Sequence, residues 1–311
     1  MKAVIIENYG GKEEMKMVEF PMPKAAANQV VIKEEATSIN PVDWKTREGY
    51  LQEVVPLEFP IILGSDVAGT IIEVGSDVMD WKVGDRVFAQ TAMTSFGTYG
   101  EYVPVEANLI AKIPSNVSFS EAAAIPLAAL MAWQGLFDYG HLKKGETVLI
   151  LGGAGGIGTY AIQFAKEIGA KVLTTASKKN HELVTSLGAD QVIDYRSEKV
   201  SDLLEDVDLV FDTIGGAAQK EAFSVLKPKT GRMITIVGLA EEGLAEKQDV
   251  YFESIFLKQN AAQLTEVVKL IEAGKVKSVI GATFPFSEKG LQDAHELSAT
   301  GHAIGKIIVE F

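Results

Sequence analysis

The sequence predicts an α/β protein in which a small β-barrel is followed by a Rossmann-type parallel sheet and then by a return to the barrel. Short stretches rich in β-branched residues and punctuated by glycines fill the first third, which is typical of a small barrel. After residue 118, strands and helices alternate with short connections, which indicates a parallel sheet covered by helices. The expected domains are 1–118, 119–258 and 259–311.

Composition narrows the classes of function. The chain has 311 residues, 47% of them hydrophobic and 23% charged, as in a soluble globular protein of one or two domains. A net charge of −13 disfavours nucleic-acid binding, and the absence of cysteine excludes disulfides and thiol catalysis. The N-terminus does not resemble a signal peptide, and no apolar run is long enough to span a membrane. We therefore expect a cytoplasmic protein that acts on a small molecule, with neither nucleic acid nor membrane as partner.

The individual elements follow from local patterns. Ser118 and Glu121 form a capping box at the start of an apolar helix that is expected to run to about residue 139. Strands are expected in the first third at 30–39, 68–74, 85–89 and 99–105, and later at 147–151, 171–176, 191–194, 209–212, 233–237 and 306–310. Helices are expected at 157–168, 179–187 and 217–226, with two more after residue 259.

The strongest local signal is a glycine-rich turn between an expected strand and an expected helix. Gly153, Gly155 and Gly158 have the G-x-G-x-x-G spacing of dinucleotide-binding proteins. The first glycine permits the turn, the second lets a pyrophosphate approach the backbone, and the third lets helix and strand pack closely. Gly156 and Ile157 open the helix, where free N–H groups can face the anion. The turn predicts a dinucleotide site.

The residues after the next strand indicate which dinucleotide binds. Enzymes that use NAD usually carry an acid there to accept a hydrogen bond from the ribose 2′-hydroxyl. Here the segment holds Ser177, Lys178 and Lys179 and no acid. Two ammonium groups suit a 2′-phosphate, so the sequence predicts NADPH as the cofactor.

The motifs together resemble a known family. The segments 145–158, 40–43, 64–69, 83–87, 187–190 and 305–308 are similar to those of the quinone oxidoreductase and ζ-crystallin group of the medium-chain dehydrogenase/reductase superfamily. Residues 40–45 and 151–156 are especially similar to plant alkenal/one reductases and enone oxidoreductases. The resemblance implies a GroES-like catalytic domain with an inserted Rossmann domain and an active site between them.

The resemblance also separates this chain from zinc alcohol dehydrogenases. Those relatives have a zinc-binding Cys where Asn40 stands and a His where Ser65 stands. Neither Asn nor Ser is a usual zinc ligand, so no metal is expected. Without a Lewis acid, hydride addition to an electron-poor carbon stays feasible. The implied reaction is hydride transfer from NADPH to the C=C bond of an enone or alkenal, or to a quinone.

Catalytic candidates come from the segment that begins at Asn40. The family comparison places the Asn40 amide near the nicotinamide, and Lys45 stands at a lysine of the alkenal reductase pattern that implies contacts to cofactor and substrate. Without the family resemblance, the sequence indicates only that Lys45 is an exposed lysine on a short helix. Asp43 and Arg47 have the spacing of an ion pair within one helix.

Further cofactor contacts are expected at the ends of later strands. Relatives place the counterpart of Tyr195 beside the adenosine 2′-phosphate. Ile214 and Gly238 follow strands on the carboxyl side of the sheet, where ligands of open α/β sheets bind.

Two alternatives stay open, and one expectation concerns assembly. The chain could be a quinone-specific oxidoreductase, or a non-catalytic NADPH-binding or structural protein. Residues 249–256 have the alternating aromatic character of a sheet edge, and superfamily relatives commonly pair such edges. We therefore expect a homodimer.

Overall fold

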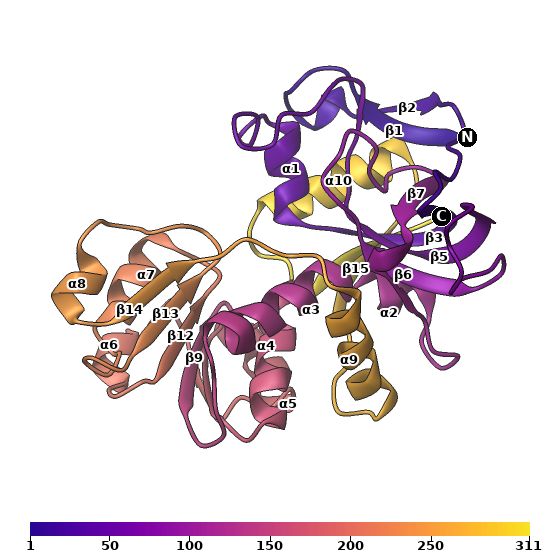
Figure 1. The fold of residues 1–311 in the computed structure, drawn as a ribbon. Helices are drawn as coiled ribbons and strands as arrows, with labels where there is room; N and C mark the ends of the chain where they lie inside the picture. The colour runs from indigo at the N-terminus through magenta and orange to yellow at the C-terminus, as the bar shows by residue number, and fades with distance from the viewer. The chain divides into compact units, whose positions relative to one another are not determined.

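The computed structural model describes residues 1–311, and the chain divides into two compact units (Figure 1). The first unit contains Met1–Leu127, Gln259–Gly274 and Ser278–Phe311, and the second contains Ala128–Lys258 and Lys275–Lys277. The first division falls at Leu127 rather than at residue 118, because helix α2 (Phe119–Ala123) packs against strands β3 and β5 of the first unit. No helix is both long and apolar enough to cross a membrane.

The first unit is built on two sheets. The larger has seven strands, in the order β15-β16-β3-β5-β6-β8 with β7 paired to β3, and the smaller has three, in the order β2-β1-β4. The strands of the larger sheet are β3 (Gln29–Ile39), β5 (Asp66–Val74), β6 (Arg86–Gln90), β7 (Tyr102–Glu106), β8 (Ile110–Lys112), β15 (Ile280–Pro285) and β16 (Lys306–Glu310). Those of the smaller are β1 (Lys2–Ile6), β2 (Lys16–Glu19) and β4 (Ile61–Ile62).

Strand β3 organises the larger sheet, because it pairs antiparallel with β5, β7 and β16. In its pairing with β16, Ile307 lies opposite Ile39. This register brings the first residue of β16, Lys306, beside the end of β3, where Asn40 begins helix α1 (Pro41–Arg47). Residues from opposite ends of the chain thus meet at one corner of the sheet.

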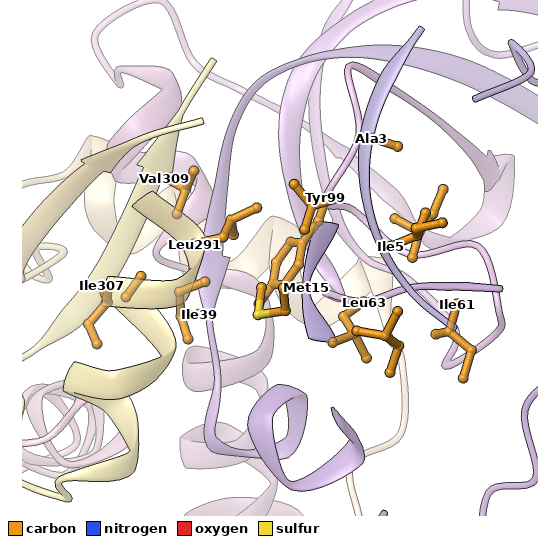
Figure 2. Close-up of a cluster of buried hydrophobic side chains, with 14 residues drawn as sticks. Ala3, Ile5, Met15, Ile39, Ile61, Leu63, Tyr99, Leu291, Ile307 and Val309 are labelled. Carbon is orange, nitrogen blue, oxygen red and sulfur yellow. The ribbon is translucent and has the colours of Figure 1, made fainter. Parts of the chain in front are cut away.

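A buried apolar cluster joins the smaller sheet to the C-terminal elements. Figure 2 shows Ile5, Leu63 and Tyr99 packed near Leu291 and Val309, and all five are at most 6% exposed. Leu291 lies on helix α10 (Glu288–Ala299), which begins where Ser287 accepts a hydrogen bond from Gly290 and which lies beside α1 (Figure 1). The remaining helix of this unit is α9 (Ala261–Glu272), capped by Asn260.

The second unit is a six-stranded parallel sheet in the order β11-β10-β9-β12-β13-β14. Its strands are β9 (Thr147–Leu151), β10 (Lys171–Thr175), β11 (Gln191–Ile193), β12 (Leu209–Asp212), β13 (Arg232–Thr235) and β14 (Tyr251–Ser254). The helices are α4 (Gly156–Glu167), α5 (His181–Ser186), α6 (Val200–Leu203), α7 (Gly216–Phe223) and α8 (Leu244–Gln248).

The predicted fold class is confirmed, and three details differ. The apolar helix expected to run from residue 118 is broken: α2 ends, α3 (Pro126–Trp133) begins at a proline, and a π-helical turn (Gln134–Tyr139) follows. Proline lacks the N–H that would continue the first helix, and it favours a helix start. The other two differences are strands that were not predicted: β15, and the short strands β1, β2, β4 and β8, although β1 contains a run of β-branched residues.

Candidate functional site

The glycine-rich turn connects β9 to α4 as predicted, but the strained residue is one position earlier. Gly152 has a φ of +83°, which favours glycine, whereas Gly153 does not. Gly153 is required for space instead, because a Cβ there would lie 2.1 Å from Thr174 Oγ1. The neighbouring strand holds the turn in place: Gly152 N donates to Thr175 Oγ1 and Gly153 N donates to Thr175 O, both at 3.0 Å.

Gly155 and Gly158 have two different roles, as the spacing predicts: one leaves open space and the other permits close packing. A Cβ on Gly158 would lie 2.3 Å from Gly152 O, so this glycine permits the close approach of helix and turn. A Cβ on Gly155 would meet only one atom, 3.5 Å away, so the space beside it is open. Gly155 begins α4 without a side-chain cap, and no acid lies in the first turn that contains Gly156 and Ile157. This helix start is free to bind an anion such as a pyrophosphate.

Positive charge follows the neighbouring strands β10 and β11. Lys178 and Lys179, in a 3₁₀ turn after β10, are exposed and pair with no carboxylate. Tyr195 follows β11 and is 53% exposed, and the guanidinium of Arg196 lies 5.8 Å from its ring centre. Because β10 and β11 are parallel neighbours, both segments leave the same edge of the sheet. Ser177, at 4% exposure, is more buried than its expected contact suggests.

The ends of β12 and β13 form an ordered apolar border beside the glycine turn. Ile214 is 57% exposed, and its Cδ1 lies 2.8 Å from where a Cβ on Gly152 would stand. Asp212 fixes this loop by accepting hydrogen bonds from Ile214 N at 2.9 Å and from Gln219 Nε2 at 2.8 Å. Gln219 Nε2 also donates to the carbonyl of Gly238, so one buried amide connects the two loops. The sequence prediction included Ile214 and Gly238 but missed Asp212 and Gln219.

In the first unit, Asn40 lies in a buried polar cluster. Asn40 is 1% exposed; its Nδ2 donates to Asp66 Oδ2 at 2.8 Å, and its Oδ1 accepts from Lys306 Nζ at 2.5 Å. Asp66 Oδ2 accepts a second hydrogen bond from Ser38 Oγ at 2.6 Å, and Oδ1 accepts from Leu127 N at 2.9 Å. Both polar ends of the Asn40 amide are thus held, which the sequence did not reveal.

Lys45 lies one turn further along α1 and is partly exposed. Its ammonium is 5.6 Å from the centre of the Trp44 ring, and it pairs with no carboxylate. Trp44 also contacts Tyr50 edge to face, at 6.2 Å between ring centres. Helix α1 thus offers a cation that has no carboxylate partner and lies over the ring of Trp44.

A hydrogen-bonded chain runs behind α1. Asp43 Oδ2 accepts from Tyr99 OH at 3.0 Å, Tyr99 OH contacts His295 Nε2 at 2.9 Å, and His295 Nδ1 contacts Arg47 Nη1 at 3.1 Å. Arg47 can only donate and Tyr99 gives its proton to Asp43, so neutral His295 carries its proton on Nε2. Asp43 also accepts from Asn40 N at 2.7 Å, which connects the chain to the Asn40 cluster.

The expected Asp43–Arg47 helix pair is wrong. Arg47 is 4% exposed and donates to His295, to Gly10 O at 3.1 Å and to Glu48. The side chain turns toward α10 because neutral acceptors and Glu48 are available there, whereas Asp43 is already occupied by Asn40 N and Tyr99.

Burial shifts the pKa of two members of the chain in opposite directions. It raises the pKa of Asp43 from 3.8 to about 7, because desolvation disfavours the carboxylate and nearby Asp66 adds repulsion. It lowers the pKa of His295 from 6.5 to about 3, because burial and the adjacent Arg47 disfavour the imidazolium. At neutral pH His295 is therefore uncharged.

Two buried polar atoms without a hydrogen-bond partner lie on Ser65, where the zinc-binding relatives have a metal ligand, and on Gln90. Ser65 Oγ and Gln90 Oε1 are buried without a hydrogen-bond partner, and Gln90 lies opposite Asp66 in the β5–β6 register. Unpaired buried polar atoms are costly and are often explained by a ligand or water. No group of three or more His, Cys, Asp or Glu side chains in the structure is placed to hold a metal ion.

The fold and the two sites define a class: a dehydrogenase with a GroES-like unit and a dinucleotide-binding Rossmann unit. Residues 26–115 match the family model described as "Alcohol dehydrogenase GroES-like domain", and residues 187–309 match "Zinc-binding dehydrogenase". The chain belongs to the quinone oxidoreductase group of the medium-chain dehydrogenase/reductase superfamily, in agreement with the resemblance seen in the sequence.

Three relatives illustrate this membership. The chain is 37% identical to "Chloroplast envelope quinone oxidoreductase homolog" of Arabidopsis thaliana, over 100% of this chain and 98% of that protein. It is also 37% identical to "NADPH-dependent alkenal/one oxidoreductase, chloroplastic" of the same plant, over 99% of this chain and 79% of that protein. The solved quinone oxidoreductase of Coxiella burnetii superposes with a TM-score of 0.93 at 34% identity, covering 100% of this chain and 99% of that one.

The opposite pKa shifts predict how stability depends on pH. Between about pH 4 and 6.5, folding places a proton on Asp43 and removes one from His295, so the two contributions nearly cancel. In His295→Gln only the Asp43 contribution remains, and stability relative to wild type should fall as pH rises, by up to about 1.4 kcal/mol per pH unit. In Asp43→Asn only the His295 contribution remains, and the stability relative to wild type should rise with pH over the same range. Thermal unfolding midpoints measured from pH 4 to 7 test this, and variants that keep the wild-type pH profile would contradict it.

Proposed function

We propose that this protein is an NADPH-dependent reductase that transfers hydride, without a metal, to the electron-poor C=C bond of an enone or alkenal or to a quinone. The observation that carries the proposal is the pair of exposed, unpaired ammonium groups, Lys178 and Lys179, on the same sheet edge as the open glycine turn. The relatives named for quinone and for NADPH-dependent alkenal/one oxidoreduction support the same chemistry.

The residues present fit the cofactor. The pyrophosphate would be held by the free N–H groups at Gly156, Ile157 and Gly158, and the open space beside Gly155 would admit it. Ser177, Lys178, Lys179 and Tyr195 would hold the 2′-phosphate, and Ile214 and Gly238 would border the rest of the cofactor. Bound NADPH would supply a hydride to the β-carbon of an enone or alkenal, or to a quinone, and these residues would hold the cofactor for that transfer.

The first unit would supply donors to the developing negative charge. We assign this role to the Lys45 ammonium and to the Asn40 amide, since donors arranged before the reaction stabilise an oxyanion most effectively. A metal ion would not suit this cluster, because the ammonium of Lys306 already lies 2.5 Å from Asn40 Oδ1 and would repel a second cation.

The proposed activity is tested by NADPH oxidation with a panel of quinones, alkenals and cyclic enones, after dialysis against a strong chelator. We expect turnover with at least one class and no loss of rate after chelation. Turnover of quinones alone would identify the quinone-specific alternative. No oxidation with any member of the panel would favour a non-catalytic NADPH-binding role, and a loss restored by zinc would refute the metal-free mechanism.

The two lysines should determine cofactor preference. Lys178→Ala/Lys179→Ala is expected to weaken NADPH binding about tenfold or more, because two charge-assisted contacts to the 2′-phosphate are lost. NADH binding should hardly change, since NADH lacks that phosphate. Fluorescence titration with both cofactors measures the effect, and equal weakening of both would show that the lysines do not contact the phosphate.

Lys45 should act mainly in the transition state. Lys45→Met keeps the length of the side chain but removes its charge, and we expect kcat to fall about 100-fold with little change in the substrate KM. Steady-state kinetics at saturating NADPH make the comparison. If the NADPH KM rises instead and kcat recovers at saturation, Lys45 anchors the cofactor; if neither constant moves, Lys45 is a surface residue.

We also propose a homodimer formed through strand β14. This strand lies at the edge of the parallel sheet and pairs with β13 alone. It carries Tyr251, which is 51% exposed, and Phe256, two residues after its end, is 78% exposed. An edge of this kind invites pairing with a second chain. Light scattering at micromolar concentration should give the dimer mass, and a monomer mass would contradict the proposal.

The cytoplasmic location expected from the sequence stays a prediction. Two of the plant relatives carry chloroplast names.

A further inference from the structure

Lys306 is a charged residue in a place where charge is costly. It is 3% exposed, and its ammonium donates to Asn40 Oδ1 at 2.5 Å and to Ile39 O at 3.2 Å, with Asp66 Oδ2 at 3.6 Å. Burial lowers the pKa of this ammonium, and only Asp66 and Asp43 offset the effect. A buried ion pair is often no more stabilising than apolar residues of the same size, so stability alone does not explain the lysine.

The lysine and the aspartate together fix the orientation of the Asn40 amide. An ammonium can only donate and a carboxylate can only accept, so Oδ1 must face Lys306 and Nδ2 must face Asp66. Nδ2 carries two hydrogens, and one of them is used by Asp66. Exactly one N–H of the amide is therefore left for another acceptor, and its direction is set by the other two contacts.

We propose that Lys306 is a positioning residue that fixes the Asn40 amide so that its remaining N–H donates to the substrate carbonyl during hydride transfer. This inference rests on the proposed function. Lys306 does not touch the substrate; it holds the amide oxygen, and a hydrogen bond to that oxygen also polarises the amide and strengthens its N–H as a donor. A donor of this kind is effective only when its direction is set in advance.

The fold supplies this contact through strand register. Ile307 lies opposite Ile39, so the preceding residue of β16 reaches the residue that follows β3. Asp66 reaches the same amide from β5, where Ser38 and Leu127 N hold its two oxygens. Two separate strands, β16 and β5, therefore fix one carboxamide.

The test separates positioning from stability by means of a charge-balanced variant. Lys306→Met leaves the Asp66 charge uncompensated and should lower both stability and kcat. Lys306→Met/Asp66→Asn removes both charges, and the new side-chain amide can still accept from Asn40 Nδ2. We expect this double variant to regain part of the stability that Lys306→Met loses, because it leaves no unpaired buried charge, although an amide has one acceptor oxygen where Asp66 uses two. Its kcat should stay about tenfold or more below wild type, with little change in the NADPH KM. A double variant that regains both stability and kcat would overturn the proposal.

A matched pair elsewhere controls for loss of a lysine–aspartate contact. Lys227 and Asp208 form an ion pair in the second unit, outside the proposed site. Lys227→Met/Asp208→Asn should leave kcat unchanged, and an equal fall in kcat there would overturn the assignment to Lys306.

A second readout does not depend on turnover. In protein labelled with ¹⁵N-asparagine, the two side-chain protons of every asparagine give separate signals, and the separation should be enlarged for Asn40 in wild type, because one of its protons is bonded to the Asp66 carboxylate. In Lys306→Met the pair should shift and broaden as the amide gains freedom, and unchanged signals would contradict the positioning role. Failure of the proposed function would appear instead as wild-type protein that oxidises no NADPH.

Discussion

The buried carboxylate of Asp66 is the contact on which the arrangement of the first unit depends. It is fully buried and accepts hydrogen bonds from Ser38, from Asn40 and from the backbone of Leu127, with the Lys306 ammonium nearby. Removing any partner of a buried charge is costly, so these groups hold one another in place. Strands β3, β5 and β16 and the start of α1 are thereby fixed around a single amide, that of Asn40.

In the second unit, the candidate cofactor site is shaped by backbone geometry rather than by a buried charge. Its glycine turn holds no side chain over the start of α4, and the adjacent strand β10 fixes the turn through hydrogen bonds to Thr175. Asp212 and Gln219 then order the loops after β12 and β13. Lys178 and Lys179, after β10, are exposed and pair with no carboxylate although the chain carries a net charge of −13.

Patterns that act over short distances in the chain were predictable. The turn at Gly153, Gly155 and Gly158, the lysines after β10 and the alternation of strands and helices all follow from local spacing. The Asn40 cluster was not, because its members lie far apart in the sequence and meet only through the register of β16 on β3. The same limit explains the wrong Asp43–Arg47 pair: helix spacing allowed it, but His295, from a distant helix, provides the partner that Arg47 contacts.

The central claim is that this chain delivers hydride from NADPH to the β-carbon of an activated alkene or to a quinone. Its most direct test is reduction of an enone by NADPH deuterated at the transferring position of C4, followed by NMR of the product. We expect deuterium at the β-carbon and hydrogen from water at the α-carbon. Deuterium at the carbonyl carbon would contradict it, because that product requires direct carbonyl reduction.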